Sequence, residues 1–290
     1  MVQSIIIYGL LNGGVFCLLA VGFSVIFGVA RIFNMAHTAF YMIAAYIIYF
    51  LAQSIGLNIA LSVGLAAIAT TLLGLLFYVV FIDRIREHET AVMMVTVALA
   101  LAIQEVFYLK FGGIYRGVPS FVSGSIEIAG VSVLWQQVLT LGIVALCLVG
   151  IWIFFGKTKV GTAIRASSQD REMASLLGID VSRICLIAMG VSVFLAAISG
   201  AVVAPLVSVE PAMWMAPLVT ILAIVVLGGL GTIWGTVAGA FILAFVQSAV
   251  VFLVPSGSFL KEAVALVVMV LVLLVKPEGL FGTVFEEERL

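Results

Sequence analysis

The chain has 290 residues, of which 64% are hydrophobic and 9% are charged, and its mean hydropathy is +1.35. Water-soluble domains are about 45–50% apolar and about 25% charged, so this composition excludes a water-soluble fold. The formal net charge of -1 excludes the broad basic surface that nucleic-acid binding requires. We therefore expect an integral membrane protein.

Apolar runs bounded by charged or turn-forming residues recur along the whole chain. A bilayer core about 30 Å thick needs roughly twenty helical residues, at about 1.5 Å each, to cross it. We predict an all-α integral membrane protein with one transmembrane domain over residues 1–290 and about nine spans, within a range of eight to ten. The predicted spans are Ile5–Val29, Ala36–Leu51, Ile59–Ile82, Ala91–Leu109, Val138–Phe155, Ile184–Leu206, Pro217–Leu230, Gly235–Val254 and Ala263–Val275.

Residues 217–254 need a turn, because a single helix of that length would be nearly twice as long as the bilayer is thick. The glycine-rich stretch Gly228–Gly235 supplies one, since glycine adopts turn conformations at little cost. A re-entrant, broken segment at the same place is the alternative. The N-terminal run is too long for a secretory signal and lacks a basic start, so we expect it to remain as the first span.

Catalytic and metal-binding patterns are not found in the sequence. Cys17, Cys147 and Cys185 lie in or at the end of apolar runs without a second ligand at metal spacing, and we interpret them as small packing residues. Gly156-Lys157-Thr158 imitates the end of a Walker A loop, but Ile151 stands where the first glycine is required. We expect no catalytic residue, no metal and no cofactor, and any ATP hydrolysis must come from a partner.

The positions of lysine and arginine predict the orientation, because basic residues are retained on the cytoplasmic side. An external N-terminus leaves three basic residues outside and puts the other ten inside, including the basic segment 156–183. The outer residues are Lys110, Arg116 and Lys261, and the inner ones are Arg31, Arg84, Arg86, Lys157, Lys159, Arg165, Arg171, Arg183, Lys276 and Arg289.

Two interrupted apolar segments are candidates for a solute path. Asn12 stands beside small residues in the first span, which indicates either tight helix packing or a helix that faces the path. The stretch 31–37 places Arg, Asn34 and His37 between two apolar runs. For Asn34 a helix cap is the alternative, and His37 is either functional or a hydrogen-bonded packing residue.

The second interruption is the glycine-rich turn, and it occupies a comparable place in the C-terminal half. Broken segments in corresponding halves point to a transporter's solute route, because their ends present unpaired backbone groups. Gly228, Gly229 and Gly231 therefore join the candidate path. Glu105 is the sole acidic residue well inside a predicted span, near its outer end. Proton-coupled and ion-coupled transporters usually carry such groups at mid-membrane, so the energy source for uphill transport is expected elsewhere.

The polar segment 156–183 contains apolar residues at helical spacing, first near Ala163 and then near Ala174. This spacing predicts two short amphipathic helices, with Gly178 ending the second. They are either a surface hairpin against lipid headgroups or a docking element whose apolar face enters a groove of a soluble partner.

A resemblance favours docking. Glu172-Met173-Ala174 followed by Gly178 matches the E-x-A-x-x-x-G core of the coupling loop of ABC importer permeases, and residues 165–179 resemble the version in the branched-chain amino acid permease family. Residues 32–37, 227–235 and 276–282 also resemble signatures of that family. These stretches are spread along nearly the whole chain in the family's order, and the sequence is therefore identified as a member.

The resemblance implies a permease subunit of an ATP-binding-cassette importer, in a bacterial or archaeal cell (inner) membrane. It would work with a second homologous permease, two ATP-binding subunits and a periplasmic or extracellular solute-binding protein. By position, Glu172, Ala174 and Gly178 would contact the ATPase, with Arg165 nearby. Met173 stands where many such permeases have a second alanine, a change that an apolar docking face tolerates.

Branched-chain or other small amino acids are the solutes that the resemblance implies, and urea or short-chain amides, which the family also carries, are the alternative. A channel for a small neutral solute, working without an ATPase, would suit the apolar composition and the glycine-rich breaks equally well. The coupling segment favours the importer, because a channel does not need a cytoplasmic two-helix hairpin. A secondary transporter is disfavoured by the missing intramembrane carboxylates.

Overall fold

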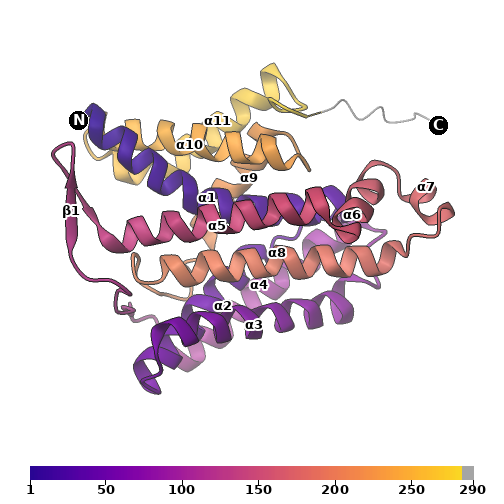
Figure 1. Cartoon of the computed structure of the whole chain (residues 1–290), viewed down its shortest axis with the longest axis horizontal. Coiled ribbons are helices and arrows are strands. Elements are labelled where there is room, and N and C mark those ends of the chain that lie inside the picture. The colour runs from indigo at the N-terminus through magenta and orange to yellow at the C-terminus, as the bar shows by residue number, and fades with distance from the viewer. Residues whose placement is uncertain (283–290) are drawn as a thin grey trace.

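The computed structural model describes residues 1–282, which form a bundle of long helices running along a common direction (Figure 1). Seven helical stretches in this part of the chain are long and apolar enough to cross a membrane, and α9 is a shorter apolar helix. The helices are α1 (Val2–Ala30), α2 (His37–Tyr49), α3 (Ile59–Phe77), α4 (Glu89–Phe111), α5 (Trp135–Lys157), α6 (Lys159–Gln169), α7 (Arg171–Leu176), α8 (Val181–Val203), α9 (Met215–Gly228), α10 (Ile233–Leu253) and α11 (Lys261–Val275).

Three short helical turns extend these helices. The π-helical turns η1 (Phe50–Ser54) and η2 (Tyr78–Ile82) continue α2 and α3, and the 3-10 turn η3 (Gly257–Leu260) leads into α11. Each of the nine predicted spans coincides with one helix or with a helix and its extension, so the helical membrane fold is confirmed. The predicted turn between two spans is also present, because α9 ends at Gly228 and α10 begins at Ile233.

The first helix is the centre of the bundle. In the most apolar window of α1, 78% of the residues are buried, against 6% in the window that covers η3 and α11. α1 packs along α10 and α8, and glycine makes the approach to α10 close: a Cβ on Gly13 would lie 2.6 Å from a ring carbon of Phe241. Small residues permit such packing between membrane helices, which lack the water-driven hydrophobic attraction of soluble bundles.

The two ends of the bundle differ. The N-terminus and the strands lie at one end, and α6 and α7 lie at the other (Figure 1). We call the end with α6 and α7 the cytoplasmic end, following the orientation that the basic residues predict. Arg289, one of the basic residues predicted to be inside, lies outside the described residues.

The all-α prediction missed a β-hairpin between α4 and α5. Strand β1 (Ser125–Ile128) pairs antiparallel with β2 (Val131–Leu134), and the two-residue turn Ala129-Gly130 has φ values of 52° and 76°. Positive φ at both turn residues suits the twist of a tight hairpin. The sequence signal is the alternation of Ile, Glu, Ile and then Val, Ser, Val around Gly130, which hydropathy windows for membrane spans do not detect.

Candidate functional site

The segment 156–183 folds into the two short helices that the apolar spacing predicts. The turn from α5 into α6 is held by Thr158, whose Oγ1 accepts a hydrogen bond from the Gly161 amide at 2.9 Å and donates one to the Phe154 carbonyl at 2.6 Å. A Cβ at Gly161 would collide with the Phe154 carbonyl, so glycine allows α6 to lie directly on the end of α5. The hairpin is thereby fixed to a membrane span.

The second helix of the hairpin, α7, is capped at both ends. Asp170 is its N-cap, and its Oδ1 accepts from the Met173 amide at 2.9 Å. At the other end the Gly178 amide donates to the Ser175 carbonyl at 2.9 Å, and Ile179 donates to Ala174 at 3.0 Å. This pair of bonds is a Schellman motif, which requires a left-handed residue at its centre. Gly178 supplies it with a φ of 84°.

The two faces of α7 differ in burial. Ala174 is 2% exposed and points into the protein, whereas Met173, Leu176 and Leu177 are 57%, 82% and 81% exposed. We call these three exposed residues the α7 face. A patch of large apolar side chains at the end of a polar hairpin is unusual on a surface in contact with water, and such patches mark sites where another molecule binds.

The four predicted coupling residues differ in exposure. Arg165, Glu172 and Gly178 are exposed at the cytoplasmic end, and Ala174 is buried beneath them. The structure therefore brings all four into one hairpin, with three of them accessible to a partner. Their role in an ATPase contact stays a prediction.

The glycine-rich turn between α9 and α10 lies against the end of α1. Gly229 and Gly231 have φ values of 101° and 78°, which favour glycine. Thr232 closes the turn, since its Oγ1 donates to the Gly229 carbonyl at 2.7 Å. A Cβ on Gly231 would lie 3.0 Å from the Gly28 Cα, so the backbones of the turn and of α1 touch directly.

Two further signature stretches meet at the same place. The Leu280 and Phe281 amides donate to the Leu227 and Gly228 carbonyls at 2.9 and 3.2 Å, which fastens residues 276–282 to the turn. From the hairpin of α6 and α7, which we call the coupling hairpin after its predicted role, Arg171 reaches the Val29 carbonyl near the end of α1. Its Nε and Nη2 donate at 3.0 and 2.8 Å. We call this meeting point, residues 28–34, 171, 228–232 and 279–281, the α1 junction.

Asn34 in the junction and His37 just beyond it are fully buried. Asn34 Oδ1 accepts from the Ala36 amide at 3.1 Å, the cap-like contact that the sequence left open as an alternative. His37 Nε2 lies 3.0 Å from the Leu19 carbonyl and Nδ1 lies 3.2 Å from Ser192 Oγ. Because a carbonyl can only accept, His37 donates through Nε2, and in the neutral ring Nδ1 accepts from Ser192. His37 thus ties α2 to α1 and α8.

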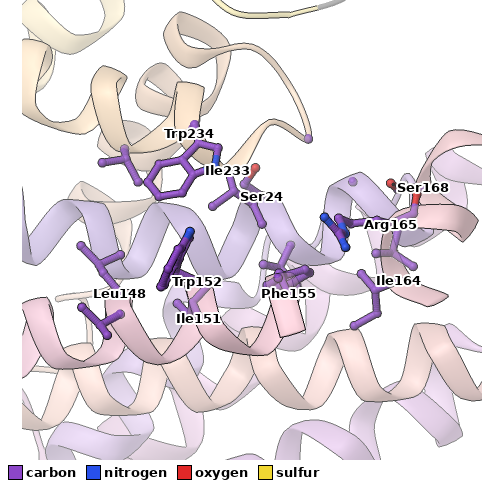
Figure 2. Close-up of a pocket in the computed structure, with 17 residues that line it drawn as sticks. Ser24, Leu148, Ile151, Trp152, Phe155, Ile164, Arg165, Ser168, Ile233 and Trp234 are labelled. Carbon is purple, nitrogen blue, oxygen red and sulfur yellow. Dashed lines mark hydrogen bonds between the residues drawn. The ribbon is translucent and has the colours of Figure 1, made fainter. Parts of the chain in front are cut away.

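A pocket of about 600 Å³ opens between α1, α5, α6 and α10, next to the junction. Figure 2 shows Trp152 and Trp234 pointing into it from α5 and α10, with Arg165 at the end formed by α6. Most of its lining is apolar. The lining residues are Ser24, Val25, Gly28, Val29, Leu148, Val149, Ile151, Trp152, Phe155, Gly156, Ile164, Arg165, Ser168, Gly231, Ile233, Trp234 and Val237.

A family model described as "Branched-chain amino acid transport system / permease component" matches residues 5–273. The chain belongs to this family. The permease is therefore a multi-pass membrane protein, as the seven candidate spans within residues 1–282 also indicate.

Curated relatives cover the permease almost end to end. It is 26% identical to the high-affinity branched-chain amino acid transport system permease protein BraD of Pseudomonas aeruginosa, with 96% of this chain and 94% of BraD covered. It is 25% identical to the probable branched-chain amino acid transport permease protein LivH of Methanocaldococcus jannaschii, with 91% and 88% covered. The solved structure of PsaBC from Streptococcus pneumoniae in complex with Fab has a similar fold, with a TM-score of 0.54, 16% identity and coverage of 96% and 97%.

Only some of the residues that line the pocket or form the α1 junction were predicted from the sequence. Of the six predicted path residues, Gly231 alone lines the pocket, whereas Asn12 is exposed on the N-terminal half of α1 and Asn34 and His37 are buried. The role of all six in a path stays a prediction. Trp152 and the contact from Arg171 to Val29 were missed, because residues so far apart in the chain carry no local signal of their proximity.

Proposed function

We propose that this permease forms the membrane path of an ATP-driven importer for branched-chain amino acids. It would pair with a second homologous permease, bind two ATP-hydrolysing subunits at its cytoplasmic end and receive solute from a binding protein outside. The family description and the names of the full-length relatives support the solute class. ATP hydrolysis is assigned to the partners, since the sequence contains no complete Walker A loop.

The observation that carries this proposal is the α7 face. Met173, Leu176 and Leu177 project from a helix that is capped at both ends and follows α6, which is anchored to α5, so they form a rigid apolar surface. An amphipathic helix of this kind is recognised by a hydrophobic groove in a partner. Its place beside Glu172 and Gly178, in the segment that resembles the coupling loop, supports an ATP-binding subunit as that partner.

We also propose that the pocket beside the α1 junction belongs to the solute route. Its volume of about 600 Å³ lies within the roughly 300–1,000 Å³ of small-molecule sites, and its apolar walls suit an aliphatic side chain. Solute passage would require α1 and α10 to separate near Gly28 and Gly231, the contact beside the pocket. The pocket would then open to one side of the membrane or to the other as the population shifts between two packings of these helices.

Six residues remain proposed for the path: Gly231, which lines this pocket, and Asn12, Asn34, His37, Gly228 and Gly229, which lie outside it. Asn34 is fully buried in the state described, so its part in a path requires a second state. Cysteine placed at Asn34 and at Gly229 should then react with a water-soluble thiol reagent in at least one transport state. Lack of reaction at both positions in every state would remove them from the path.

Co-purification tests the docking proposal. The permease is tagged in its native membrane, extracted gently, and the ATP-binding subunits recovered with it are quantified. Leu176→Glu combined with Leu177→Glu should reduce their recovery at least tenfold, because a groove that receives apolar side chains would have to bury two carboxylates. Gln169→Glu is the matched control, since it adds a carboxylate to an exposed position of the same hairpin away from the α7 face. Equal recovery from the double variant and the control would refute docking at this face.

A further inference from the structure

Arg171 connects α7, the helix that carries the α7 face, to the end of α1. Helix α1 ends at Ala30, and the last four carbonyls of a helix lack partners within the helix. Arg171 satisfies one of them with two donors, Nε at 3.0 Å and Nη2 at 2.8 Å from the Val29 oxygen. A cation at this position also opposes the partial negative charge of the helix C-terminus. The bond is therefore charge-assisted and fixed in direction.

The bond joins two parts that are each rigid. On one side Arg171 is the first residue of α7, next to the N-cap Asp170, so its backbone moves with that helix. On the other side the Val29 side chain is 2% exposed and packed in the core. Arg171 itself is half-buried, and burial lowers the pKa of its guanidinium from the ordinary value. An arginine nevertheless stays protonated at neutral pH, so the charge is retained.

Beyond Val29 the contact continues to the pocket. Gly28 and Val29 are both part of the pocket wall, and Gly28 touches the backbone of Gly231 in the turn that begins α10. A displacement of α7 that carries Val29 with it would therefore change both the width of the pocket and the contact between α1 and α10. The chain also runs directly from α7 into α8, and α8 and α6 both pack against α1, but the bond from Arg171 is what ties α7 itself to the end of α1.

We propose that Arg171 is the positioning residue that transmits movement of the coupling hairpin to α1 and thereby to the pocket. This inference rests on the proposed importer function. Arg171 would contact neither solute nor ATP, and it would act through its bond to Val29. Two helices joined by a double hydrogen bond move together, whereas with the bond removed α7 can move while α1 stays packed in the bundle.

The test uses the complete importer in liposomes and measures both ATP hydrolysis and uptake of labelled leucine. Arg171→Gln should keep ATP hydrolysis and lower uptake per ATP about tenfold, since it removes a charge-assisted bond. Arg171→Lys, which keeps the charge but not the planar fork, should fall between that variant and the unchanged protein. Arg183→Gln is the control. It removes an arginine whose side chain is 83% exposed and pairs only locally with Asp180, so the uptake ratio should not change.

A distance measurement separates transmission from simple stabilisation. Spin labels on Ser175→Cys in α7 and on Arg31→Cys, the exposed residue that follows α1, should keep a constant separation through the ATP cycle in the unchanged protein, because α7 and the end of α1 would move together. In Arg171→Gln this separation should vary with the bound nucleotide. If Arg171→Gln does not assemble, the same comparison is made with Arg171→Lys. Uptake per ATP and nucleotide response identical to the unchanged protein would overturn the inference, whereas an unchanged complex that takes up no leucine would refute the proposed function instead.

Discussion

Replacing Gly178 with valine isolates the contribution of the hairpin's end to coupling. Gly178 has a φ of 84°, and a Cβ added there meets no atom within 4 Å, so the whole cost comes from backbone conformation. A left-handed conformation costs an ordinary L-residue roughly 1–2 kcal/mol and a β-branched one more, so we take about 2 kcal/mol. That amount shifts the balance between the capped and the frayed end of α7 by roughly 30-fold.

Uptake per ATP in liposomes is the assay, with membrane insertion checked by extraction and gel filtration. Gly178→Val should insert normally and lose most of its uptake per ATP. Gly178→Asn should stay close to the unchanged protein, because asparagine tolerates the left-handed region. Gly56→Val is a matched control: its φ is 74° and its surroundings are equally open, but it lies in the loop between η1 and α3. Normal coupling in Gly178→Val, or equal loss in Gly56→Val, would refute the reasoning.

Three other substitutions test the packing around the site. Asp170→Ala should destabilise α7 by about 1 kcal/mol and lower uptake per ATP. Asp170→Asn keeps a good N-cap and should do neither. Equal losses of uptake per ATP in the two variants would contradict the capping role. His37→Leu removes the hydrogen bonds to Leu19 and Ser192, each of which contributes about 1 kcal/mol to the free energy of unfolding. This variant should therefore have a lower melting temperature in detergent, and an unchanged melting temperature would contradict the role of His37 in joining α2 to α1 and α8. Gly231→Ala should destabilise by roughly 1–2 kcal/mol because of its positive φ and its contact with α1, whereas Gly142→Ala, in open space on α5, should not. Equal thermal stability of the two glycine variants would argue against the close approach.

The membrane spans and the coupling hairpin could be predicted from sequence because each depends on local information. Runs of apolar residues as long as the bilayer is thick define spans wherever they occur. The hairpin likewise follows from apolar spacing in α6 and α7 and from Gly178, which ends the second helix as expected. The turn at Gly228 was predictable because a helix through it would be too long.

The rest could not be predicted because it depends on contacts between distant segments. Arg171 and Val29 are 142 residues apart, and no local pattern pairs an arginine with a carbonyl at the end of another helix. The burial of Asn34 and His37 is similar, since Met189 and Ser192 of α8 complete their surroundings. The pocket was missed because no single helix among α1, α5, α6 and α10 carries its pattern.

The most direct test of the importer is uptake by the purified complex in liposomes with and without ATP on the cytoplasmic side. The account predicts that this permease co-purifies with ATP-binding subunits, and that labelled leucine accumulates against its gradient with ATP and with the solute-binding protein. It also predicts that excess urea or acetamide does not compete. Solute flux through the permease alone, without ATP and never against a gradient, would contradict the account and indicate a channel.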